Sequence, residues 1–373
     1  EGESISESYL ATILKEEGFP RIWRGPSRPG KQARDGSEVP PVADVHELDL
    51  TAGRTIGTQV AGLFLFIPLL LESKFARAVS TTIYPGTQQV PAAQALLALL
   101  ISKLLGKRRV SHITDLSMDE GAGLFAGLNV PVKTTYATDY SYKATRSMNQ
   151  KFLDFLVGQL PLEEAPLQFN LDFHAVPFRG TNNDLENHWV AMSHKGLPSV
   201  MTFVAQESTR RVMCYATANV LREETDEMVV RFARHWKQRH GQYPGRMLFD
   251  SRATTYEYLD ELNRLHVGFI TIRRRGAAMI HRVRALPKSS WSSCQVTQAK
   301  GKRRSVRYLD EEVRLDGYEG TVRQLVVEGL GHESPTFLLT NDKPESLTAR
   351  EVLETYASRN HVEHSLGEKI TFF

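Results

Sequence analysis

The stretch 167–176, which alternates strictly between apolar and polar side chains as far as Ala175, constrains the fold more than any other part of the chain. Alternation with a period of two predicts a β-strand, because successive side chains of a strand point to opposite faces. The apolar row must pack on a core. The polar row, which contains Asp172 and His174, faces either solvent or a site, and the stretch alone leaves both possibilities open.

The chain after residue 161 continues with short β segments and two helices. Strands are expected at 189–193, 199–206, 211–217, 246–250 and 267–272, with a hairpin turn at 196–198, and helices are expected at 223–240 and 256–265. If the segment 189–193 is only a lead-in, the order is three meandering strands, helix, strand, helix, strand. This order is that of an RNase H-like fold, an α/β fold with a mixed sheet and flanking helices.

The chain before residue 161 has a different texture. Residues 55–160 carry apolar side chains at helical spacing, which predicts a helical domain with 92–105 as its buried helix. Ser117 and Glu120 have the spacing of a capping box for a helix at 118–126. A bundle of short helices suits DNA binding and a purely structural role equally well.

Charge is distributed unevenly along the chain. Residues 271–307 contain eleven Lys or Arg side chains and no Asp or Glu, although the net charge of all 373 residues is only +3. Strands expected at 306–315, 321–328 and 336–340 make this region β-rich. The basic run suits a polyanion and argues against a glycosidase, because a neutral sugar has no use for such a field.

These patterns define an expected domain organisation. An α/β core with an RNase H-like mixed sheet is interrupted by a β-rich insertion and preceded by a helical N-terminal domain. The segments are a flexible basic arm at 1–54, a helical and DNA-binding domain at 55–160, the first part of the core at 161–274, the basic β-rich insertion at 275–342, and a C-terminal helix of the core at 343–373, capped by Ser346.

Cysteine usage and hydropathy bear on the compartment. Cys214 and Cys294 lie far apart, which excludes a disulfide framework and fits a reducing compartment. The most apolar runs, 61–71 and 92–105, fall short of the roughly 18 to 20 apolar residues that a membrane helix needs. A cytoplasmic protein without a membrane segment is therefore expected.

Three acids occupy places where they could meet. Asp172 lies in the first strand, Asp250 ends a later strand, and Glu363 lies on the last helix. In an RNase H-like sheet the two strands are neighbours and the helix packs across their ends, so the three carboxylates would converge. Mg²⁺ prefers such hard oxygen ligands, and a pair of bound ions supports in-line phosphoryl transfer.

The run 356–363, Tyr-Ala-Ser-Arg-Asn-His-Val-Glu, resembles the Y-x2-R-x3-E signature of IS4-type DDE transposases. The sequences around Asp172 and Asp250 are similar to the first and second acid motifs of that family, and segments 123–129 and 338–341 are similar to flanking sequences of some members. In the family a Lys follows the Glu by seven residues, whereas here Lys369 follows Glu363 by six. The resemblance covers about residues 55–373.

This resemblance implies metal-dependent cleavage at transposon ends and strand transfer into target DNA. Asp172, Asp250 and Glu363 would be the catalytic acids and the ligands of Mg²⁺, with Mn²⁺ as a substitute. The implied partners are double-stranded DNA, as transposon ends and as target, and a second copy of the chain in a homodimer in the bacterial cytoplasm, associated with the nucleoid. The alternative is a truncated or domesticated transposase-derived DNA-binding protein without catalytic activity, which the early end of the chain favours.

Eight further residues are expected to contact DNA. Arg359 and Tyr356 share a helix face with Glu363, where Arg359 either holds a phosphate or forms an ion pair with Glu363. Trp291 either stacks on a flipped base or packs in the core. The basic residues of the insertion form either a phosphate-binding patch or a solvated turn. The expected set is Tyr356, Arg359, Lys369, Trp291, Lys300, Lys302, Arg303 and Arg304.

Overall fold

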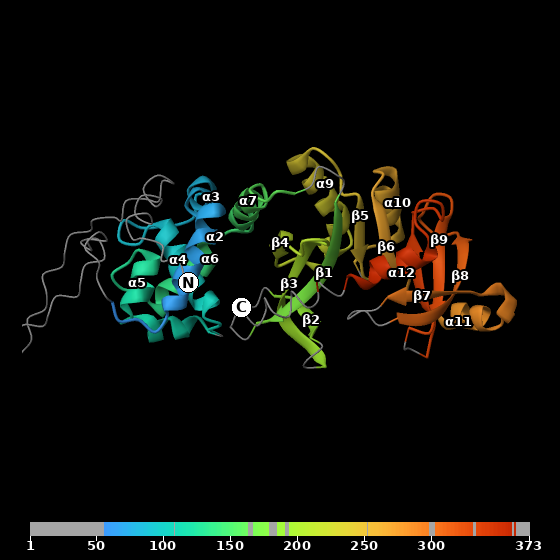
Figure 1. Cartoon of the computed structure of the whole chain (residues 1–373), viewed down its shortest axis with the longest axis horizontal. Helices are drawn as coiled ribbons and strands as arrows, with labels where there is room; N and C mark the ends of the chain where they lie inside the picture. The colour runs from blue at the N-terminus through green and yellow to red at the C-terminus, as the bar shows by residue number, and fades with distance from the viewer. Residues whose placement is uncertain are drawn as a thin grey trace, which may run out of the picture. The chain divides into compact units, whose positions relative to one another are not determined.

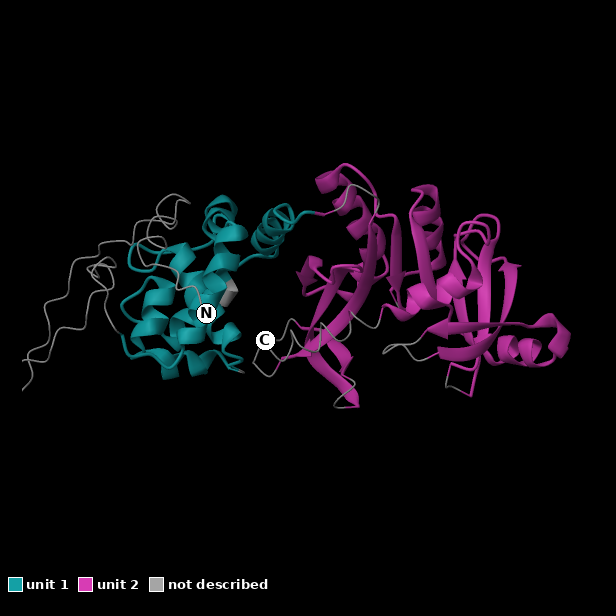
Figure 2. Ribbon diagram, viewed as in Figure 1, with its two compact units in different colours: residues 1–161, 369–373 teal, residues 162–368 magenta. Residues whose placement is uncertain are grey.

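The structure, a computed structural model, describes residues 56–107, 109–162, 167–178, 185–190, 194–251, 253–297, 303–330, 333–359 and 362, apart from the side chains at 141–142. The chain divides into two compact units at the boundary between Pro161 and Leu162 (Figure 2). None of the described helices combines the length and the apolar character needed to cross a bilayer.

The described part of the first unit is helical, as its apolar spacing predicts (Figure 1). Its core surrounds the expected buried helix, in which Ala95, Ala98 and Ile101 are fully buried. The helices are η2 (Ala61–Phe66), α2 (Ile67–Glu72), α3 (Phe75–Thr82), α4 (Ala92–Leu104), η3 (Val110–Leu116), α5 (Glu120–Ala126), α6 (Thr134–Lys143) and α7 (Arg146–Val157).

Asp119 caps α5, so the capping box predicted at Ser117 is wrong. One carboxylate oxygen of Asp119 accepts from the Ala122 N–H at 2.8 Å and from the Thr58 hydroxyl at 2.7 Å, and the other accepts from the Gln59 N–H at 2.8 Å. A carboxylate has acceptor capacity for several donors, whereas the single hydroxyl of Ser117 is already bonded to a backbone carbonyl. Asp119 therefore fixes both the start of α5 and the segment that precedes η2.

The second unit is built on one large mixed sheet, which has ten strands within the described residues. The sheet order is β2-β3-β1-β5-β6-β10-β9-β8-β7, and β4 pairs with β3 off this path. The strands are β1 (Gln168–Pro177), β2 (Asn187–Val190), β3 (Lys195–Glu207), β4 (Met213–Ala218), β5 (Arg246–Phe249), β6 (Gly268–Ile272), β7 (Ser292–Thr297), β8 (Arg303–Val313), β9 (Val322–Glu328) and β10 (Thr336–Thr340). The helices are α8 (Arg222–Thr225), α9 (Met228–His240), α10 (Tyr256–Arg264), α11 (Ala277–Arg284), η5 (Lys288–Ser290) and α12 (Ala349–Ala357).

The element order of the first part of this unit matches the prediction. Strands β1, β3 and β4 pair antiparallel in a meander, and β5 and β6 then continue parallel to β1 after α9 and α10. Two details differ from the prediction. The segment 196–198 lies inside β3, where it pairs with β2, and the helix expected at 223–240 is split into α8 and α9.

The β-rich segment expected at 275–342 extends the same sheet. Strand β10 pairs antiparallel with β6 on one side and with β9 on the other, and β8 and β7 follow outward. The chain then returns in α12, whose N-cap is Thr348 rather than Ser346. Thr348 and Glu351 form a reciprocal capping box, whereas the Ser346 hydroxyl donates to the Lys343 carbonyl.

Helices cover both faces of the sheet around β1. Phe169 and its register neighbours on β5 and β6 point to the face on which α9 lies, with the Phe169 ring 4.6 Å from that of Trp236. Leu248 and Ile270 point to the other face, where they pack with Val352 of α12. Strand β1 is therefore an interior strand of a three-layer arrangement.

The polar row of β1 begins in the protein interior. Asn170 is fully buried, and neither atom of its side-chain amide has a hydrogen-bond partner. Its cross-strand neighbour Gln206 is also fully buried. The solvent alternative for this row is therefore wrong at Asn170, because cover on the second face extends to this position.

Candidate active site

The first two candidate acids belong to neighbouring strands. The parallel pairing of β1 with β5 aligns Gln168, Phe169 and Asn170 with residues 246, 247 and 248. Asp172 lies two residues further along β1, in the middle of the strand, and Asp250 directly follows Phe249, the last residue of β5. The side chain of Asp172 has the parity of Asn170, the register partner of Leu248, and therefore points to the face that α12 covers.

Arg359 contacts the first of these acids. Its Nη1 atom lies 3.3 Å from Oδ1 of Asp172, and Arg359 is 8% exposed overall. Helix α12 ends at Ala357, and the Arg359 N–H bonds to the Tyr356 carbonyl in the turn that follows. The helix face predicted to carry Tyr356, Arg359 and Glu363 together is thus wrong for Arg359, since this residue lies beyond the helix end.

Tyr356 lies at the end of the neighbouring strand. Its hydroxyl is 3.5 Å from the carbonyl oxygen of Phe249, the last residue of β5, and its ring packs partly against the α12 core. The Arg359 guanidinium lies 6.0 Å from the Tyr356 ring centroid, at the limit of a cation–π contact. The last turn of α12 and the turn that follows it therefore place a phenol at the end of β5 and a guanidinium against the middle of β1.

The donor chemistry of these residues suits a hard divalent cation. Asp172 and Asp250 offer two carboxylates, and Arg359 already pairs with the first of them. Within the described residues no group of three or more His, Cys, Asp or Glu side chains forms a metal site. Glu363, the third candidate, lies outside the described residues, and so do Lys369, Lys300 and Lys302.

His174 lies two residues beyond Asp172 on the same face of β1. Burial lowers the pKa of His174 below its usual value, because it disfavours the charged imidazolium. Arg359 is a cationic side chain that lies against Asp172.

The described basic residues of the insertion are only partly available for DNA. Arg303 is exposed and Arg304 half-buried at the start of β8. Elsewhere in the run 271–307, Arg282 pairs with Glu311 and Arg307 with Glu328. Acids on β8 and β9 thus neutralise part of the charge that the sequence shows as unopposed.

Trp291 packs against the core of the insertion. It is half-buried beside Val283 and Phe337, and the Arg307 guanidinium lies 5.6 Å from its ring centroid. One face of the indole is therefore already occupied by a cation. This environment matches the packing alternative for Trp291, and a stacked base would have to use the remaining surface.

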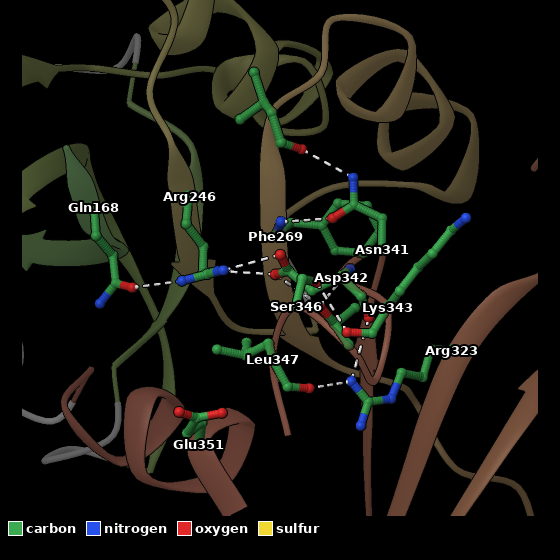
Figure 3. A network of polar contacts seen from close by, with 12 residues as sticks. Gln168, Arg246, Phe269, Arg323, Asn341, Asp342, Lys343, Ser346, Leu347 and Glu351 are labelled. Atoms are coloured by element: carbon green, nitrogen blue, oxygen red, sulfur yellow. Dashed lines mark hydrogen bonds and ion pairs between the residues drawn. The ribbon is translucent and has the colours of Figure 1, made fainter. Parts of the chain in front are cut away.

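A polar network at the opposite ends of the parallel strands was not anticipated from the sequence (Figure 3). Arg246, the first residue of β5, donates two hydrogen bonds of 2.9 Å to the carboxylate of Asp342 and one of 3.4 Å to Gln168. Asn341 accepts from the Phe269 N–H at 2.9 Å and donates to the Val267 carbonyl at 3.0 Å. The end of β10 is thereby tied to the starts of β1, β5 and β6.

The sequence singled out one part of this network, the segment 338–341, but only as a segment similar to flanking sequences of the transposase family. Its Asn341 serves the backbone of β6 rather than a ligand, because its amide offers one acceptor and two donors to a strand start. Arg246 and Asp342 are 96 residues apart, and no local pattern links them.

Comparisons with known proteins leave the family open. No family model matches the chain, and no curated protein matches it. Among solved structures, the catalytic domain of human Endonuclease V aligns at 11% identity with a TM-score of 0.24, covering 54% of this chain and 85% of that one. A second structure of human Endonuclease V aligns at 10% identity and the same TM-score, covering 54% of this chain and 86% of that one.

Proposed function

We propose that this chain is a DDE-type DNA transposase with an RNase H-like core, which cleaves DNA at transposon ends and joins it to target DNA. Its substrate is double-stranded DNA, and a homodimer pairs the two ends. Mg²⁺, or Mn²⁺ in its place, is the cofactor, held by Asp172, Asp250 and Glu363.

The observation that carries this proposal is the contact of Arg359 with Asp172. The two residues are 187 positions apart in the chain and lie 3.3 Å from one another. The parallel pairing of β1 with β5 also makes the strand that precedes Asp250 the neighbour of the strand that carries Asp172. The strands of this part lie in the order β4-β3-β1-β5-β6, and β3 is antiparallel to both β4 and β1. This arrangement supports an RNase H-like core.

The residues have distinct roles in the proposed reaction. Asp172 of β1 and Asp250, which follows β5, would hold Mg²⁺ together with Glu363, and the ion would supply Lewis acidity at the scissile phosphate. Arg359 lies against Asp172 with a planar fork of donors, which suits a phosphate oxygen when its contact with Asp172 is exchanged. Tyr356 holds the end of α12 against β5.

Calorimetric titration of Mn²⁺ into the full chain tests the proposal directly. Binding is expected in the wild type and is expected to be lost in both Asp172→Asn and Asp250→Asn, which keep side-chain shape and remove one charge each. Asp316→Asn is the matched control, since Asp316 is an exposed acid elsewhere in the second unit. Circular dichroism establishes that each variant is folded.

Cleavage of labelled duplex in Mg²⁺ is then measured on the same four proteins. The proposal requires activity in the wild type and in Asp316→Asn and none in the other two. Metal binding that survives both active-site substitutions would show that the site lies elsewhere. The wild type could instead bind duplex DNA without binding metal and without cutting the DNA. That result would make the non-catalytic DNA-binding protein the better account.

A further inference from the structure

Helix α11 and the residues that flank it carry more positive charge than their surroundings neutralise. Residues 273–288 contain six Lys or Arg side chains and no Asp or Glu. Within the described part of the chain, one of the six forms an ion pair, Arg282 with Glu311. Four of the others are exposed and form no such pair there: Arg274, Arg275, Arg284 and Lys288.

Two of these arginines reach the same short segment, 333–335. Arg275, which precedes α11, donates from Nη1 to the Pro335 carbonyl at 2.7 Å. Arg284, the last residue of α11, donates from Nη2 to the Glu333 carbonyl at 3.4 Å. Groups two residues apart along a chain are separated by at most about 7 Å, so the segment holds both guanidiniums on one side of the helix.

The acceptors that orient this pair are neutral. A backbone carbonyl fixes a guanidinium without cancelling its charge, and each guanidinium has five N–H donors in a fork that matches a phosphate. By contrast, Arg282 on the same helix donates from both Nη atoms to the carboxylate of Glu311. Glu333 contributes its carbonyl to Arg284, and no ion pair joins these two described residues. The pair Arg275 and Arg284 therefore keeps its charge and most of its donors.

The pair follows the strand that neighbours the end of β5. Strand β6 is parallel to β5, with Thr271 opposite Phe249 (Figure 1). Asp250 directly follows β5, and Arg275 lies four residues beyond Thr271. Four residues span at most about 14 Å and neighbouring strands are about 5 Å apart, so the Cα atoms of Arg275 and Phe249 lie within about 20 Å of one another. A duplex with a phosphate beside Asp250 covers this distance in about six base pairs of 3.4 Å each.

We propose that Arg275 and Arg284 bind the phosphate backbone of duplex DNA beside the candidate active site. This inference rests on the proposed function for its substrate class. Exposed cations at both ends of a helix suit a repeating polyanion better than a single small anion. The phosphate contact expected from the sequence at residues 300–304 is thereby assigned to the end of β6 and to α11.

Equilibrium binding of a labelled duplex over a range of salt concentrations tests the proposal. Each lost phosphate contact lowers the slope of log affinity against log salt by about 0.9, so Arg275→Gln with Arg284→Gln should lower it by about two. The same relation predicts an affinity loss of about 60-fold at 0.1 M salt and little loss at 1 M salt. The double change to Lys keeps both charges and should keep the slope.

Arg282→Gln is the matched control. It removes the same charge from the same helix, but Glu311 already neutralises that charge, so the slope should stay at the wild-type value. Circular dichroism melts establish that each variant is folded at the assay temperature. The Lys variants retain a measurable test if a Gln variant does not fold.

The possible outcomes separate this proposal from the proposed function. A wild type that binds and cuts duplex, with an unchanged slope in the double Gln variant, would refute the arginine site alone. An equal change of slope per arginine in Arg282→Gln would also refute it, because net charge would then explain the effect. A wild type that binds duplex through the pair but neither binds Mn²⁺ nor cuts would support the site and refute the transposase.

Two further results would overturn the choice of DNA. Vesicles of phosphatidylserine and phosphatidylcholine test a membrane surface as the alternative polyanion. Vesicle binding that the double Gln variant loses, with unchanged DNA affinity, would assign the pair to lipid headgroups. A wild type without affinity for duplex at any salt concentration would refute both proposals together.

Discussion

The ion pair between Arg246 and Asp342 provides the sharpest test of how the sheet is held together. It joins the start of β5 to the residues after β10 through two hydrogen bonds of 2.9 Å, and the two side chains are 24% and 16% exposed. We expect Asp342→Ala to destabilise the second unit, because Arg246 would lose both bonds while staying largely buried.

The magnitude follows from the geometry. A hydrogen bond to a charged group contributes about 1.5 to 3 kcal/mol, so two such bonds set an upper value of about 6 kcal/mol. Partial exposure lets water replace part of the interaction, and Gln168 still accepts from Arg246 at 3.4 Å. We therefore expect a loss of about 2 to 3 kcal/mol in the free energy of unfolding.

Urea unfolding followed by tryptophan emission is a suitable assay, because Trp189, Trp236 and Trp291 all lie in the second unit. Glu319→Ala is the matched control: its carboxylate is 82% exposed, it pairs with Arg264 at 3.5 Å, and its removal should change stability by less than about 0.5 kcal/mol. A double-mutant cycle with Arg246→Ala should give a coupling energy of about 1 to 3 kcal/mol. A coupling near zero would refute the claim that this pair holds β10 to β5.

Three further changes test other parts of the fold. Phe169→Ala should cost about 3 to 5 kcal/mol in urea unfolding, because the fully buried ring packs against Trp236 at 4.6 Å; a loss below about 1 kcal/mol would contradict the burial. Thr348→Ala should cost about 1 kcal/mol by removing the N-cap of α12, and Thr348→Ser should restore it. Asp119→Ala should cost about 2 kcal/mol in the first unit, measured by the circular dichroism melt, since the cap and the bonds to residues 58 and 59 are all lost. Burial works against the charge of Asp119, but hydrogen bonds from Thr58 and from the N–H groups of 59, 121 and 122 outweigh it and lower its pKa below the usual 3.8. Its contribution is therefore present above about pH 4 and is lost as the pH falls through the lowered value, a loss that Asp119→Ala should not show.

The elements of the second unit were largely predictable because their signals are local. The alternation at 167–176, the apolar face of the helix that became α9, and the breaks at Gly and Pro each depend on neighbouring residues, and their order was sufficient to predict the arrangement of β1, β3, β4, β5 and β6. Caps were less predictable. Ser117 has the spacing of a capping box and Ser346 is a residue that often caps helices, but the N-caps are Asp119 and Thr348, whose side chains accept from backbone N–H groups of the first turn.

The sequence by itself therefore determined the order of strands and helices, the helical character of the first unit, and the choice of Asp172, Asp250, Tyr356 and Arg359 as candidate residues. Only the tertiary structure decided which of them meet. The parallel pairing makes β1, which carries Asp172, the neighbour of β5, which Asp250 follows, and the turn after α12 brings Arg359 to Asp172 across 187 residues. It also decided which tryptophan is exposed, because burial depends on what packs against a side chain. Local patterns report the preferences of neighbouring residues, whereas register, pairing and exposure depend on contacts between segments distant in the chain.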